Sequence, residues 1–304
     1  MAGLKTIKGK IRSVEKTKKV TKAMEAVSAA KMRKAQNRAL AGRAYARAAV
    51  SILARASGSR ELLSHPLTEK RAVNKALYIV ITSDKGLAGA LNSAVLRATL
   101  SDISKAGLSR ENVSVLAVGR KSHDFFAVRG YKVETYHQNT DHIDSKLIRE
   151  LVDLAAKHYS SKAADTVKIA YQNFFSTFEQ RPTLRTIFPL SIEELEKVVS
   201  DILPVRGALA KNTSEVRPES YTIEPSEEEV FNAILPRLAG IFVFHALLES
   251  QASEHSARMV AMKSAGDKAG EMKASLTLSF NKARQAAITR EVSEITGGME
   301  ALSI

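Results

Sequence analysis

The chain has 304 residues, of which 46 are Lys or Arg and 32 are Asp or Glu, so its formal net charge is +14. Apolar residues make up 44% of the chain, which is enough to build a core and excludes wholesale disorder. The absence of Cys excludes disulfides, thiolate metal sites and thiol nucleophiles.

The positive charge is concentrated at the N-terminus. Residues 1–57 contain nine Lys and six Arg but only two acidic residues, Glu15 and Glu25. The other 247 residues are nearly neutral, with 31 basic and 30 acidic side chains. The net charge is therefore a property of one segment and not of the whole surface.

Residues 1–58 are predicted to form one long helix. Apolar residues recur at steps of three and four, with Thr17 bridging one gap, and no Pro precedes Pro66. Ala and long side chains dominate the later part, and both favour helix, which is expected to end near Gly58. The apolar stripe consists of Leu4, Ile7, Ile11, Val14, Val20, Met24 and Val27.

Residues 59–225 are predicted to form a globular α/β domain. Strands alternate with helices, which indicates a mostly parallel, Rossmann-like sheet. Residues 204–220 are polar, contain two Pro and lack periodicity, so a mobile loop is expected there. The expected strands are Ala76–Ile81, Val113–Val118, Val167–Phe174 and Leu184–Phe188, and the expected helices are Asn92–Ala106, Lys121–Arg129 and residues 145–158.

A second long helix is predicted over residues 226–304. Ser226 and Glu229 form a capping box, and the acidic residues beside them favour the start of a helix. A heptad seam then continues for seven repeats, and the next stop signal is Gly297-Gly298. Pro236 lies in the first turns and is expected to kink the helix.

The two long helices are expected to pair, because neither can bury its stripe alone. They lie at opposite ends of the chain, so the simplest arrangement is a long antiparallel coiled coil with the α/β domain inserted between its helices. The chain lacks a run of about 20 apolar residues, the length needed to span a bilayer, so it is expected to be soluble or peripheral.

No catalytic, cofactor or metal site is expected. The turn Thr82–Gly89 follows a strand and precedes a helix, where α/β folds cradle phosphate, but it lacks the known phosphate-loop patterns. A tight turn whose glycines permit close packing or positive φ is favoured there. The seven His have no metal-ligand spacing, and His245 and His255 fall on the seam, where polar residues set register.

The basic N-terminal helix fits three classes of partner. Nucleic-acid binding usually interleaves aromatic residues or glycines, and Tyr45 is the only aromatic residue in residues 1–57. Membrane binding requires bulky apolar residues, whereas this helix is mostly Ala beyond Val27. Docking against acidic protein surfaces is the favoured interpretation.

Several separate stretches resemble the gamma subunit family of F-type ATP synthases, and they occur in family order over the whole chain. The C-terminal signature of that family is present, with Met299 in place of its last Ala, and Ala88 stands where many members carry Cys. The matching stretches are Ile7–Met32, Ser83–Asn92, Ser253–Met262, Phe280–Gln285 and Ile288–Gly298.

The resemblance implies a non-catalytic rotor shaft inside a ring of three alpha and three beta subunits. The c-ring, driven by protons, would turn the shaft, and the globular end would bind the epsilon subunit and the c-ring. The implied location is the cytoplasmic face of the bacterial inner membrane, where the chain would be peripheral. The resemblance implies contacts with the beta subunits at Met24, Arg284, Gln285, Thr289 and Glu291.

Two other classes remain open. An RNA-binding protein with a helical-hairpin arm accounts for the charge and the coiled coil but not for the C-terminal signature. An α/β enzyme that uses the Ser83–Gly89 turn would bind nucleotide saturably.

Overall fold

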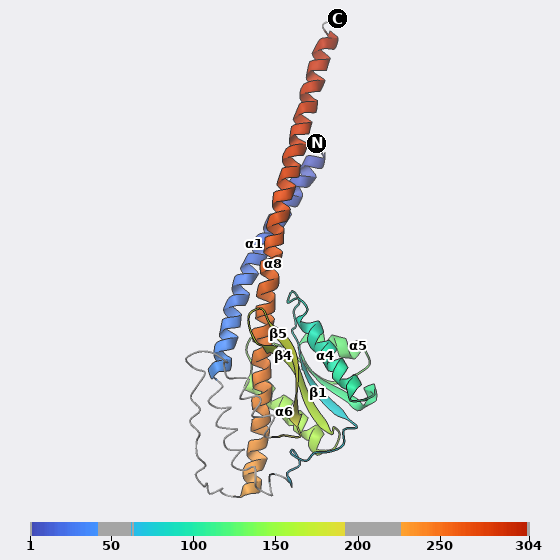
Figure 1. Ribbon diagram of the computed structural model, residues 1–304, viewed down its shortest axis with the longest axis vertical. Coiled ribbons are helices and arrows are strands. Elements are labelled where there is room, and N and C mark those ends of the chain that lie inside the picture. Colours follow the sequence, from blue (N-terminus) through green and yellow to red (C-terminus); the bar gives the residue numbers. More distant parts are fainter. Residues whose placement is uncertain (1, 42–61, 63, 192–225, 303–304) are drawn as a thin grey trace. The chain divides into compact units, whose positions relative to one another are not determined.

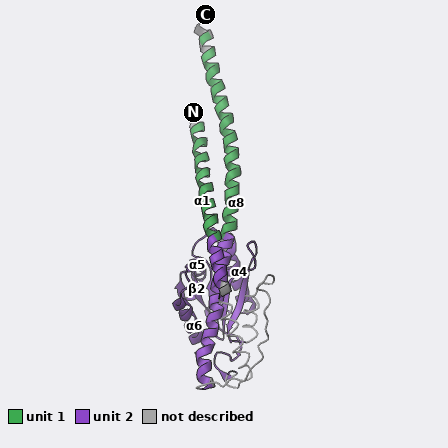
Figure 2. Ribbon diagram, turned by 90° about the vertical axis from the view of Figure 1, so that its left-hand side faces the viewer, with its two compact units in different colours: residues 1–29, 258–304 green, residues 30–257 purple. Residues whose placement is uncertain are grey.

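A computed structural model describes residues 2–41, 62, 64–191 and 226–302 (Figure 1). It divides into unit 1, residues 1–29 and 258–304, and unit 2, residues 30–257 (Figure 2). Two helices, α1 (Ala2–Ala41) and α8 (Glu227–Leu302), contribute to both units. The rest of the predicted N-terminal helix and the predicted loop 204–220 lie outside the described residues.

Unit 2 contains a five-stranded sheet in the order β3-β2-β1-β4-β5. Neighbouring strands are parallel except for β5, which is antiparallel to β4. This confirms the predicted mostly parallel sheet, and the strand order matches the first five positions of the doubly wound Rossmann order. The strands are β1 (Ala76–Ile81), β2 (Val113–Val118), β3 (Lys132–His137), β4 (Thr166–Phe174) and β5 (Gln180–Phe188).

Helices cover both faces of the sheet. Because successive side chains of a strand point to opposite faces, β1 contributes to two cores. Leu77 and Ile79 pack in the cluster that includes α6 and the first part of α8, and Tyr78 and Val80 pack in the cluster that includes α4 and α5. These helices are α4 (Leu91–Lys105), α5 (Arg120–Val128) and α6 (Ser145–Ser160), and a short 3-10 helix spans Arg110–Asn112.

The predicted strands and helices of this domain are present with shifted ends. The last strand begins at Gln180, before the predicted start at Leu184. The strand β3 was not predicted, because it lies at the edge of the sheet and none of its residues is buried. It therefore lacks the run of apolar residues that marks β1 and β2.

The helix α8 lies within the predicted range 226–304 and begins as predicted, but it passes the stop signal at the two glycines. Ser226 caps it, with the Glu229 N–H donating to the Ser226 Oγ at 3.3 Å. The helix continues through Pro236 and through Gly297-Gly298 to Leu302, so the predicted stop at the two glycines is wrong. Glycine lowers helix propensity by only about 1 kcal/mol, which does not end a long helix unless other breakers follow. The kink at Pro236 stays a prediction.

Part of α8 is apolar enough to cross a membrane by length and composition alone. Among the described residues this helix is the one candidate, with an 18-residue window of mean hydropathy 1.6, of which 56% is buried inside the structure. The first part of the helix packs in the core against the sheet, through residues such as Leu235, Phe242 and Leu247. Core helices of soluble proteins have this same composition, so the window is weak support for a span.

Candidate functional site

Two antiparallel helical segments form unit 1, from α1 and α8 (Figure 2). Glu15 and Lys273 form an ion pair with 3.3 Å between the Lys273 Nζ and a carboxylate oxygen. A Cβ on Gly266 would lie 3.1 Å from the Thr21 Oγ1, so the helices approach closely there. These contacts define an antiparallel register.

The contact seam of unit 1 contains small and polar side chains. Thr21 and Ser28 are buried, whereas Val20 and Val27 are 57% and 55% exposed. The predicted apolar stripe is therefore wrong at Val20 and Val27, whereas Met24 between them is partly buried. The seam follows a seven-residue repeat through Thr21 and Ser28, because small residues there allow close contact, and this leaves the two valines one position off the seam.

The helix α8 extends beyond α1 (Figure 2). Continuing the register brings the first residue of α1 level with about residue 286 of α8. We call residues 284–302 the α8 tip. The tip carries an exposed apolar stripe at steps of four and three, with exposed fractions from 52% to 67%. The stripe consists of Ile288, Val292, Ile295 and Met299.

Four of the five predicted contact residues flank this stripe. At about 100° per residue, Arg284 and Glu291 lie on one side of the stripe and Gln285 and Thr289 on the other. All four are exposed, and the Thr289 Oγ1 donates a hydrogen bond to the Gln285 carbonyl oxygen at 3.0 Å. The fifth, Met24, lies on α1 and is partly buried.

The apolar stripe of the tip is not among the predicted contact residues, although the sequence contains a signal for it. These residues fall in the stretch that resembles the C-terminal signature of the family. Their steps of four and three predict one helical face. An apolar helical face this exposed indicates a surface for a protein partner.

The Thr82–Gly89 turn bonds its polar groups within the α/β domain. The Ser83 N–H donates to the Asn92 Oδ1 at 2.9 Å, and the Asp84 Oδ1 accepts from the Arg120 N–H at 2.7 Å. Gly89 has a φ of +60°, as predicted for this turn. The described contacts therefore support a packed strand-to-helix turn, which was the favoured interpretation.

The two seam histidines lie in unit 2. Both are buried. The His245 Nε2 lies 3.5 Å from a carboxylate oxygen of Glu249, and the His255 Nε2 lies 3.2 Å from the Asp141 Oδ1. His255 thus links α8 to the α/β domain in addition to its expected place on the seam.

A full-length family match accompanies this geometry. The model of the family described as ATP synthase matches residues 3–302. An ATP synthase gamma chain from Heliobacterium modesticaldum is 39% identical over 99% of this chain and 100% of its own length. The chain belongs to the ATP synthase gamma chain family.

Two solved structures share the fold of this chain. A chain in the central stalk and c-ring structure of the Tetrahymena thermophila mitochondrial ATP synthase is 23% identical, with a TM-score of 0.61 over 81% of this chain and 99% of that chain. A chain in the Euglena gracilis mitochondrial ATP synthase is 18% identical, with a TM-score of 0.65 over 99% of this chain and 95% of that chain. At these identities the likeness shows the fold alone.

Proposed function

We propose that this chain is the central rotor shaft of an F-type ATP synthase. It couples rotation of a proton-driven c-ring to conformational change in catalytic beta subunits, and in the reverse direction it is driven by ATP hydrolysis. The observation that carries the proposal is the exposed apolar stripe of the α8 tip, where α8 extends beyond α1. The chain that carries this stripe matches the gamma chain family over its full length.

The tip suits a shaft that turns inside a ring. Its exposed apolar stripe would be covered by a surrounding protein surface, because a patch of this kind is unfavourable in water. The flanking residues Arg284, Gln285, Thr289 and Glu291 supply polar groups for the beta subunits. Met24 would face the acidic loop of a beta subunit.

The remaining parts of the assignment belong to the same proposal. The chain has no catalytic site of its own, and catalysis belongs to the ring. The α/β domain binds the epsilon subunit and the c-ring at the cytoplasmic face of the bacterial inner membrane. The proposed division is 1–58 for the first coiled-coil helix, 59–225 for the α/β domain and 226–304 for the second coiled-coil helix.

Substitutions at the tip test the proposal in the assembled, membrane-bound complex. Arg284→Ala and Gln285→Ala are expected to lower ATP hydrolysis and ATP-driven proton pumping, by up to about tenfold, because each removes a polar contact with the ring. Circular dichroism of the free chain should be unchanged, since both side chains are exposed.

Arg290→Ala is the matched control. Arg290 is exposed on the same tip but points away from the apolar stripe, about 240° around the helix from Arg284. Wild-type hydrolysis and pumping are expected for this variant. Normal rates in both test variants would refute the proposed contacts. Failure of the wild-type chain to join an alpha and beta ring, together with base-selective RNA binding, would refute the shaft itself.

A further inference from the structure

One carboxylate of the α/β domain contacts both long helices. Asp141 lies between β3 and α6, and its Oδ2 accepts a hydrogen bond from the Lys31 Nζ of α1 at 2.5 Å. Its Oδ1 lies 3.2 Å from the His255 Nε2 of α8. The Asp141 carbonyl oxygen also accepts a bond from the Arg38 Nη1 of α1 at 3.0 Å. Asp141 therefore joins three elements of unit 2.

The helix α8 has further polar links to this domain. The Ser253 Oγ donates to the Gln172 carbonyl oxygen at 3.1 Å, and the Ser256 Oγ donates to the Thr177 carbonyl oxygen at 2.6 Å. A carboxylate oxygen of Glu249 accepts a bond from the backbone N–H of β4 at 2.8 Å. Loss of Asp141 would therefore leave α8 attached to the sheet.

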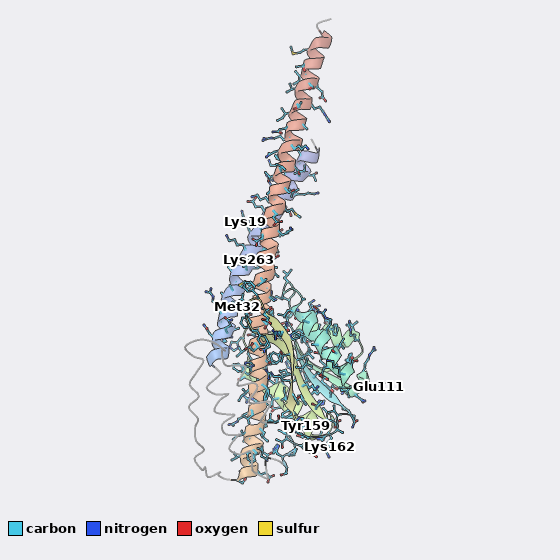
Figure 3. The ribbon with its side chains drawn as sticks, in the orientation of Figure 1. Lys19, Met32, Glu111, Tyr159, Lys162 and Lys263 are labelled. Atoms are coloured by element: carbon cyan, nitrogen blue, oxygen red, sulfur yellow. The ribbon has the colours of Figure 1, made fainter. Side chains whose placement is uncertain are left out.

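The helix α1 depends on Asp141 far more. In the described ranges of the chain, both of its polar contacts to the α/β domain end on Asp141. Two apolar residues of this part of α1, Met32 (labelled in Figure 3) and Ala35, are also buried. Apolar contacts hold surfaces together without a preferred direction, whereas hydrogen bonds with ionised partners resist sliding and rotation.

The Asp141 carboxylate is ionised, as an ion pair with Lys31 requires. Partial burial acts to raise the pKa of Asp141, but the Lys31 ammonium and His255 outweigh it, so the pKa lies below the ordinary value. The group is therefore ionised at neutral pH. Because the side chain of Asp141 is 59% exposed, its ion pair contributes at most about 1 kcal/mol to global stability.

We propose that Asp141 is the joint through which α1 follows the α/β domain when that domain turns. The inference rests on the proposed shaft function and names the residue that transmits torque to the first helix. Lys31 and His255 are close in sequence to the two ends of unit 2, at Ala30 and Ala257. Asp141 thus contacts both helices inside unit 2, close to the residue at which each helix passes into unit 1.

Hydrogen exchange on the full chain tests the attachment itself. In Asp141→Asn and Lys31→Gln, amides of residues 138–144 and of α1 from residue 31 to residue 38 are expected to exchange up to about fivefold faster, since a charge-assisted bond is lost. Lys34→Gln is the matched control, because Lys34 has the same charge on the same helix and makes no described hydrogen bond to Asp141. The same amides in Lys34→Gln should exchange at the wild-type rate.

Coupling in the assembled complex tests the mechanical role. In Asp141→Asn and Lys31→Gln, protons pumped per ATP hydrolysed are expected to fall about twofold, whereas hydrolysis itself falls less. The double variant should lose no more coupling than Asp141→Asn alone, because both substitutions break the same ion pair between Lys31 and Asp141. Asp141→Glu should restore most of the coupling, since it keeps the charge.

The outcomes separate the joint from the shaft. If the wild-type complex pumps normally and Asp141→Asn pumps equally well, the joint is refuted and the shaft function stands. An equal loss in Lys34→Gln would also refute the joint, because charge on α1 would then be the cause. If the wild-type chain neither assembles nor supports pumping, the shaft function fails and the joint fails with it.

Discussion

The two units bury different kinds of side chain. In unit 2 the interior holds aromatic and branched residues, such as Tyr78, Phe126 and Phe188, none of them accessible to solvent. In unit 1 the buried positions include Thr21, whereas Val20 and Ile288 are more than half exposed. Unit 2 is therefore stabilised by its own core, and unit 1 keeps apolar surface that a partner can cover.

This difference changes how apolar periodicity is interpreted. In a globular core the largest apolar residues mark the interior, because burial of their area is the main stabilising term. In the coil of unit 1 the helices approach closely at small residues such as Gly266, so Val20 and Val27 point outward even though Met262 is buried. A stripe found by its hydrophobicity alone can then be the outer face of the coil.

The largest expected effect tests the core of unit 2. Phe126→Ala should lower the free energy of unfolding by about 3–5 kcal/mol, because it leaves a cavity between α5 and the sheet. Val20→Ala, on the exposed face of unit 1, should change it by less than about 0.5 kcal/mol. Urea denaturation followed by circular dichroism measures both. Similar losses in the two variants would contradict the comparison.

Substitutions at two glycines test the difference between the two units further. At Gly119, φ is +92° and a Cβ would lie 2.0 Å from the Thr82 carbonyl oxygen, so Gly119→Ala should cost about 2–5 kcal/mol. Gly266→Ala should change stability by less than about 1 kcal/mol, because helix propensity improves while the Thr21 hydroxyl has to move slightly. Thermal unfolding measures the loss of stability in both variants. A larger loss in Gly266→Ala than in Gly119→Ala would show that the coil is as rigid as the turn.

The smallest expected effect is a pH dependence at Asp141. Its pKa is lowered in the folded chain, so its contribution to stability is present above the ordinary value of 3.8 and is lost as the pH falls through the lower folded value. The stability difference between wild type and Asp141→Asn, at most about 1 kcal/mol near neutral pH, should therefore shrink at a pH below the ordinary value of 3.8. Urea titrations at both pH values measure it, and a difference that grows on acidification would exclude the ion pair as its source.

The sheet was predictable where its strands are buried on both faces. Continuous apolar runs mark β1 and β2, and the structure places both strands at the predicted residues. The edge strand β3 has no buried residue, so its pattern resembles that of a loop. Local composition alone does not distinguish an exposed edge strand from an irregular segment.

The coil was predictable as an element but not in its packing. Capping at Ser226 and the long heptad pattern located α8 correctly. The choice of Val20 for the seam failed because contact between helices depends on close approach at Gly266, which involves residues far apart in the chain. For the same reason Asp141 was not anticipated as a contact, since its partners come from both ends of the chain.

The unbroken course of α8 has a consequence for the kinds of mutation that the chain tolerates. The helix continues from residue 257 to residue 258 with no interruption, so the backbone itself connects the two units there. Inserting one residue just after this point would turn every later residue by about 100° and shift it by about 1.5 Å along the axis. Arg284 and Ile288 would keep their chemistry but face another direction. We therefore expect this stretch to accept many substitutions and very few single-residue insertions or deletions.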